Sequence, residues 1–135
     1  MADDSDIKIK VDPQNGGIEK FFGRLEAIVM DIVWANGPLT VKRALYFINK
    51  NNKYAYTTIM TIMSRLTDKG FLKREKVSHS YLYSASMEKK KFIGYAVEKT
   101  INSLMADFQS ATTKAYYDSK KSSSGKKSKS TDKKN

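Results

Sequence analysis

The chain has 135 residues, of which 40% are apolar, enough for one small hydrophobic core and too few for a second. Lys and Arg number 25 against 14 Asp and Glu, and this net charge of +11 favours a polyanionic partner: nucleic acid, an anionic membrane or an acidic protein. The sequence contains no cysteine, which excludes disulfides, thiolate metal sites and cysteine nucleophiles.

Polar segments flank the predicted core. Residues 1–17 end in a run of turn-forming residues and are expected to form a flexible leader outside the core. Residues 118–135 hold seven Lys, six Ser and two Asp without one apolar side chain. Nothing there offsets the entropy of ordering, so we expect a disordered basic tail.

No run approaches the roughly 18 apolar residues of a membrane span, and the start lacks a secretory signal, so a soluble, cytoplasmic protein without a membrane partner is expected.

Three helices are predicted before residue 70. Apolar residues at steps of three and four from Phe21 to Val33 indicate the first helix, which should end at Gly37 because glycine accepts a positive φ there. Thr40 can cap a second, shorter helix. A third helix should begin at residue 56 or 57 and end at Gly70. It should turn four apolar side chains inward: Ile59, Ile62, Met63 and Leu66.

Two strands are predicted after the third helix. Residues 71–77 and 81–85 are rich in aromatic and branched side chains, with the polar tip Ser78 to Ser80 between them. Two strands and a tip form a β-wing. Residues 18–87 are therefore expected to form a winged helix-turn-helix domain in a mainly α fold.

Residues 88–117 are predicted to form one long helix, because the segment lacks proline and has a single glycine near its start. Six apolar residues repeat at alternating steps of four and three, as in a coiled coil, and such a seam needs a partner. The simplest partner is a second copy of the chain, so the helix is interpreted as a dimerisation helix; the alternative is that it folds back onto its own domain. The predicted dimer interface is Val97, Ile101, Leu104, Phe108, Ala111 and Ala115.

The outer face of the third helix carries short polar side chains opposite the apolar stripe. Thr and Ser can bond to base edges in the major groove, and Thr methyls and Met can contact thymine methyls. The alternative is a Thr-rich face that is merely solvated. The residues predicted to read bases are Thr57, Thr58, Met60, Thr61 and Arg65.

Positive charge surrounds this helix in the sequence. Residues 42–91 hold 12 Lys or Arg against 3 acids. Cations at such positions contact phosphates and hold a protein in register on the duplex without reading sequence. The predicted phosphate contacts are Lys42, Arg43, Lys53, Lys69, Lys73, Arg74 and Lys76.

No catalytic apparatus is recognisable. His79 is the only histidine and lies at a predicted turn, which makes a poor metal site. There is no glycine-rich phosphate loop and no nucleophile motif. The sequence therefore predicts neither an enzyme nor a cofactor or metal site.

Three blocks carry a family resemblance. They are LEAIVMDIVWANGPLTV from Leu25 to Val41, AYTTIMTIMSRLTDKGF from Ala55 to Phe71, and a basic strand followed by YLYSAS. Within residues 22–86 they resemble the penicillinase-repressor (BlaI/MecI) family of winged-helix transcription regulators. The resemblance implies a homodimeric repressor that binds a palindromic operator, reads bases from the third helix and dimerises through its C-terminal segment. The half-sites should then lie about one DNA turn apart, roughly 34–36 Å.

The sequence also departs from this family. Members that respond to β-lactams are cut by a sensor protease at an Asn-Phe bond beyond the wing, and copper-responsive members use C-terminal cysteines. This chain has neither the dipeptide nor a cysteine. The resemblance therefore identifies no sensor protease as a partner and no inducing signal.

Two other functions remain open from the sequence. One is a weakly specific architectural protein that coats DNA, helped by the Lys/Ser tail. The other is a winged-helix module for protein interaction, since a fold alone does not fix function.

Overall fold

The structure is a computed structural model that describes residue 7 and residues 9–134, with side chains described up to residue 121. The chain forms two compact units, Met1–Ala96 and Val97–Asn135. The predicted fold class is confirmed: a mainly helical chain with a two-stranded wing and a long C-terminal helix. Within the described residues, no helix combines the length and the apolar character needed to cross a bilayer.

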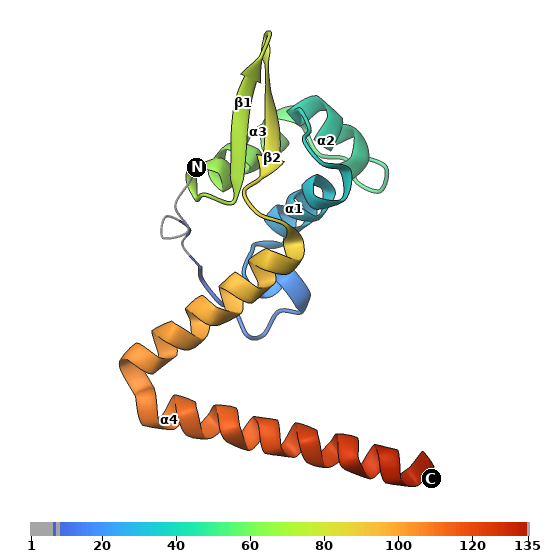
Figure 1. Ribbon diagram of the computed structural model, residues 1–135. Coiled ribbons are helices and arrows are strands. Elements are labelled where there is room, and N and C mark those ends of the chain that lie inside the picture. The colour runs from blue at the N-terminus through green and yellow to red at the C-terminus, as the bar shows by residue number, and fades with distance from the viewer. Residues whose placement is uncertain (1–6, 8, 135) are drawn as a thin grey trace. The chain divides into compact units, whose positions relative to one another are not determined.

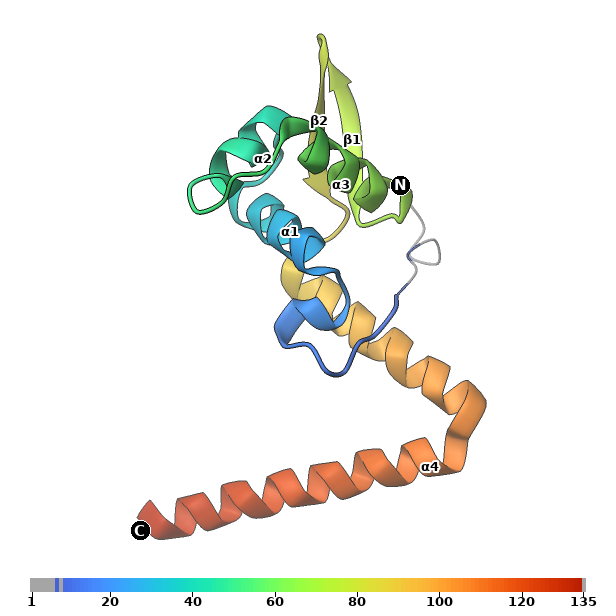
Figure 2. The same ribbon diagram turned by 180° about the vertical axis from the view of Figure 1, so that it is seen from behind.

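Three α-helices, a 3-10 helix, a hairpin and the first turns of a fourth helix make up the described part of the first unit. Figure 1 shows the two strands projecting together beyond the helices, and from behind α3 lies across the base of the strands (Figure 2). Packing of α1, α2 and α3 on one another, and of α3 on β1, builds this arrangement. The elements are a 3-10 helix η2 (Gly17–Lys20), α1 (Arg24–Asn36), α2 (Val41–Ile48), α3 (Tyr56–Asp68), β1 (Leu72–Val77) and β2 (Ser80–Ala85). The last helix, α4 (Lys89–Lys134), begins in this unit and continues into the second.

The turn between α1 and α2 forms as the sequence predicts. Gly37 has a φ of 74° and its N–H donates to the carbonyl of Val33 at 2.9 Å, which ends α1. The chain then pairs Leu39 with Tyr83 of β2. Thr40 caps α2, because its hydroxyl oxygen accepts from the N–H of Arg43 at 3.1 Å. This cap fixes where α2 begins.

The wing is an antiparallel hairpin in which Arg74 lies opposite Tyr83. Its turn consists of two residues, Ser78 and His79, and Ser78 has a φ of 58°. Ser80 therefore belongs to β2 rather than to the tip, a one-residue difference from the predicted boundary. Successive side chains point to opposite faces of the hairpin.

An aromatic cluster joins the start of α4 to the winged domain. Phe92 is 1% exposed, and its ring centroid lies 5.2 Å from that of Phe22, 5.5 Å from Trp34 and 5.7 Å from Phe71. The indole N–H of Trp34 also donates to the carbonyl of Met87 at 2.9 Å. The first two turns of α4 thus belong to the core of the first unit.

The N-terminal segment contributes to the core as well. Ile7 is buried and Ile9 packs against the core, so the leader expected outside it supplies two core side chains. Two apolar residues in a polar stretch are too few to show a period in the sequence. Residues 1–6 and 8 lie outside the described part of the leader.

The second unit consists of the rest of α4. Phe108 has non-helical angles, φ −139° and ψ 53°, so the predicted long helix is bent at this residue. Heptad spacing does not reveal the bend, because it continues unchanged through Phe108. The tail expected over residues 118–135 lies in the last part of α4, mostly beyond the described side chains, and its disorder stays a prediction.

Candidate nucleic-acid interface

The outer face of α3 is exposed where the sequence predicts base-reading residues. Ile59, Met63 and Leu66 are each 0% exposed and turn into the core. Thr57 and Thr61 lie about opposite them on the helix and are exposed. The helical period therefore separates a buried apolar stripe from a free polar one.

The two threonines are connected by a hydrogen bond. The hydroxyl of Thr61 donates to the carbonyl oxygen of Thr57 at 2.9 Å. With its proton used in this way, the Thr61 oxygen has only acceptor capacity towards an external group, and its methyl stays free. In this rotamer Thr61 suits a base-edge donor, such as the amino group of adenine or cytosine, or a thymine methyl.

The other predicted reading residues lie on the two flanks of this stripe. Met60 is 40% exposed and lies on the flank that faces the wing. Thr58 and Arg65 are exposed on the opposite flank. Tyr56, the first residue of α3, is 49% exposed beside Met60, and sequence reasoning missed it because it was considered only as a helix boundary.

A groove separates the wing from the first turns of α2 and α3. It encloses about 350 Å³. The first residues of both helices form one side and the wing forms the other. It is lined by Thr40, Val41, Lys42, Tyr56, Met60, His79, Ser80, Tyr81 and Tyr83, and no carboxylate lies among these residues.

The predicted phosphate contacts are spread over the elements around α3. Lys42 and Arg43 lie in the first turn of α2, and Lys53 lies in the loop before α3. Three more cations lie on β1, where strand alternation places Lys73 on one face and Arg74 and Lys76 on the other. Six of the seven predicted cations are exposed, and Lys73 is partly buried.

Three of these cations already have partners within the chain. The guanidinium of Arg43 lies 4.9 Å from the ring centroid of Tyr46. That of Arg74 lies 4.5 Å from the ring of Tyr81 and shares a side-chain hydrogen bond with Tyr83, which raises the pKa of Arg74. Stacking on a ring leaves the in-plane N–H groups of arginine available to a phosphate.

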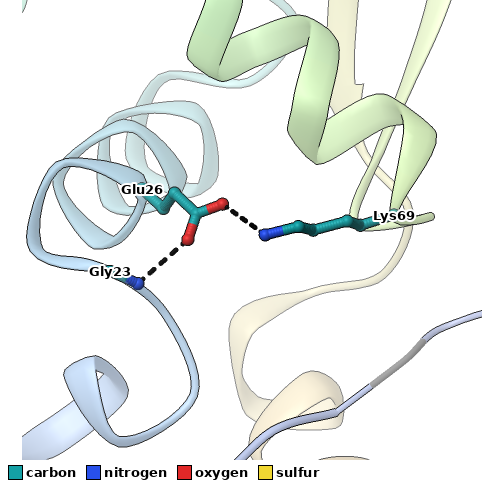
Figure 3. A network of polar contacts seen from close by, with 3 residues as sticks. All are labelled: Gly23, Glu26 and Lys69. Atoms are coloured by element: carbon teal, nitrogen blue, oxygen red, sulfur yellow. Dashed lines mark hydrogen bonds and ion pairs between the residues drawn. The ribbon is translucent and has the colours of Figure 1, made fainter.

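Lys69 is the third engaged cation. Its ammonium lies 2.9 Å from one carboxylate oxygen of Glu26, whose other oxygen accepts from the N–H of Gly23 at 2.9 Å (Figure 3). Burial acts to raise the pKa of Glu26, but these two hydrogen bonds and the charges of Lys69 and Arg65 outweigh it, so the pKa is lowered. Glu26 thus links the start of α1 to the end of α3.

In the second unit, five of the six residues predicted to form the dimer interface line one apolar hollow, and Val97 lies outside it. Leu104 and Phe108 are 45% and 62% exposed, and Val97 is 45% exposed. The hollow is lined by Ile101, Leu104, Phe108, Ala111, Thr112, Ala115, Tyr116 and Ser119.

Comparison with known proteins identifies a family that the chain matches. Residues 22–127 match the family described as penicillinase repressor. The match runs through the wing and on along α4, well beyond residue 86. An uncharacterized 16.5 kDa protein of Latilactobacillus sakei is 34% identical over 59 residues. That alignment covers 44% of this chain and only 40% of the relative.

Two solved structures are similar to the chain. The DNA-binding domain of the repressor BlaI is 23% identical and has a TM-score of 0.47, over 62% of this chain and 89% of that one. A transcriptional regulator of Thermotoga maritima is 15% identical and has a TM-score of 0.44, over 77% of each chain.

Proposed function

Because this chain belongs to the penicillinase repressor family, we propose that it represses transcription as a homodimer bound to a palindromic operator. Family membership makes it a DNA-binding transcription regulator and not an enzyme. Sequence-specific reading, the dimer and the symmetry of the operator are the parts that need testing.

One observation supports sequence-specific reading above all. The exposed stripe of α3 presents Thr57 and Thr61 with no acid between them, and cations lie on α2, the loop before α3 and β1. Phosphate contacts from these cations position the helix, whereas the threonines and Met60 meet base edges. A solvated threonine face would not require this cationic frame.

Equilibrium binding to operator and to random duplex tests the proposal. Thr57→Ala or Thr61→Ala should cost about 1–3 kcal/mol on the operator and little on random DNA. Lys73→Ala should weaken binding to both duplexes alike, because a phosphate contact is blind to sequence. Equal losses on both duplexes for the threonine variants would contradict base reading.

The apolar hollow of the second unit supports the dimer. Leu104 and Phe108 are large apolar side chains that are exposed to solvent. A partner helix that packs on them would remove this apolar surface from water and so favour association. A second copy of the chain carries the same apolar surface, and in a two-fold dimer the two subunits contact each other through the same patch. The bend at Phe108 means that the two helices need not pair as one straight coiled coil.

Leu104→Asp tests this interface. A charge in the middle of the hollow should shift the chain from dimer to monomer in sedimentation equilibrium, while the winged domain stays folded. Asn102→Asp adds the same charge at an exposed position outside the hollow and serves as the control. A dimer that survives Leu104→Asp would place the interface elsewhere.

A further inference from the structure

We propose that the groove between the wing and the first turns of α2 and α3 seats a phosphate of the DNA backbone, and that His79 makes this contact dependent on pH. The inference rests on the proposed function, since the phosphate is that of the operator. It gives a role in DNA binding to residues that are neither predicted base readers nor predicted phosphate contacts, among them Tyr56, His79 and Tyr81.

The chemistry of the groove matches an anion. Lys42 lies on one wall and His79 on the other, and neither takes part in an ion pair among the described residues. Tyr56, Ser80 and Tyr81, each of which carries a hydroxyl group, also line the groove. These are the side chains that commonly donate to phosphate oxygens at protein–DNA interfaces.

Its position favours the DNA backbone over a free anion. Tyr56 and Met60 line the groove from α3, and Thr57 and Thr61 lie on the adjacent stripe of the same helix. When that stripe enters the major groove of DNA, as the reading helix of a helix-turn-helix does, we place a backbone strand of the duplex between α3 and the wing. A phosphodiester is therefore brought to the groove by the same docking that brings bases to the threonines.

The groove contains one histidine, His79. Histidine is the side chain whose charge ordinarily changes between about pH 5 and pH 8. The groups that surround His79 in the groove are Lys42 of α2, Tyr56 of α3, and Tyr81 and Tyr83 of the wing. Arg74, stacked on Tyr81, is a further cation behind that ring.

Lys42 gives the groove one cation at neutral pH, and protonated His79 gives it a second. A phosphate between them favours the imidazolium form, so DNA binding and proton uptake are coupled. Because the imidazolium is favoured in the complex, affinity rises as pH falls. Since the chain has a single histidine, the part of such a change in affinity that is lost in His79→Gln reports on His79.

Fluorescence anisotropy with the full chain and an operator duplex measures this coupling. At equal ionic strength, the wild-type protein should bind about threefold to tenfold more tightly at about pH 6 than at about pH 8. His79→Gln should bind equally at both pH values. Lys42→Gln should weaken binding to operator and random duplex alike and lower the salt slope by about 0.9.

Matched variants separate the groove from general charge. Lys10→Gln removes one exposed cation outside the groove and should keep the pH dependence and the affinity. Tyr56→Phe removes one hydroxyl without changing charge and should weaken binding at both pH values. His79 and Lys42 are exposed, so circular dichroism should show folded variants in each case.

The single imidazole also gives a direct signal by NMR. Its titration midpoint should rise when operator DNA is added and should stay in place with inorganic phosphate at the same ionic strength. An equal rise with inorganic phosphate would identify a free-anion site and overturn the assignment to DNA.

Three further results would overturn the proposal. They are wild-type affinity that is the same at both pH values, a pH dependence that persists in His79→Gln, and Lys42→Gln or Tyr56→Phe variants that bind as the wild type does. In each of these cases specific operator binding still stands. A chain that binds neither duplex at any pH would instead refute the proposed function.

Discussion

Replacement of Glu26 by Gln should weaken the fold and strengthen DNA binding at the same time. The glutamine oxygen can still accept from the N–H of Gly23, so the start of α1 keeps its hydrogen bond. The charge that holds Lys69 at 2.9 Å is lost. Lys69 is then free for a phosphate, and the link between α1 and α3 is weaker.

The size of the effect follows from exposure. The Lys69 side chain is 49% exposed and that of Glu26 is 14% exposed, so solvent screens the pair in part. The loss in free energy of unfolding should be about 1 kcal/mol, between an exposed ion pair and a buried charged hydrogen bond. Freeing one cation should raise the salt slope of DNA binding by about 0.9.

Acid should remove the difference in stability. The pKa of Glu26 is lowered in the folded chain, so its stabilisation is complete at neutral pH and is lost as pH falls through that lowered value. Urea unfolding of wild type and Glu26→Gln at neutral and acidic pH measures this. In a double-mutant cycle, Lys69→Gln should add little to Glu26→Gln. Equal stability at neutral pH, or a difference that acid leaves intact, would refute this reasoning.

Two other substitutions test the fold. Phe92→Ala should cost about 3–5 kcal/mol, because the ring is 1% exposed and contacts several aromatic rings, and thermal unfolding followed through Trp34 should show it; an unchanged Tm would mean that the start of α4 does not belong to the core. Ser78→Gly should stabilise the wing by about 0.5–1 kcal/mol, because glycine relieves the φ of 58° at a cost in chain entropy. A less stable variant in urea unfolding would mean that Ser78 makes a contact worth more than the strain.

Local signals in the sequence predict most of the winged domain. Gly37 ends α1 and Thr40 caps α2 because each acts on backbone groups within four residues of itself. The helical period likewise predicts that Thr57 and Thr61 are exposed, since α3 has one continuous apolar stripe. These features need no knowledge of the rest of the fold.

Features that depend on distant segments could not be predicted in this way. The cluster around Phe92 joins the start of α4 to rings of α1, the turn before it and the residue before β1. The groove likewise needs the wing to be placed beside α2 and α3 before Tyr56 and His79 come together. Phe108 fits the heptad and yet bends the helix, because spacing constrains side chains and not backbone angles.

Selection of bound duplexes from a random pool, by wild type and by Thr61→Ala side by side, tests base reading by α3 most directly. The wild type should return two symmetric half-sites about one DNA turn apart, roughly 34–36 Å between centres. The variant should return the same spacing with the preference lost at one position in each half-site. Identical sequences from both proteins, or none from the wild type, would contradict the account.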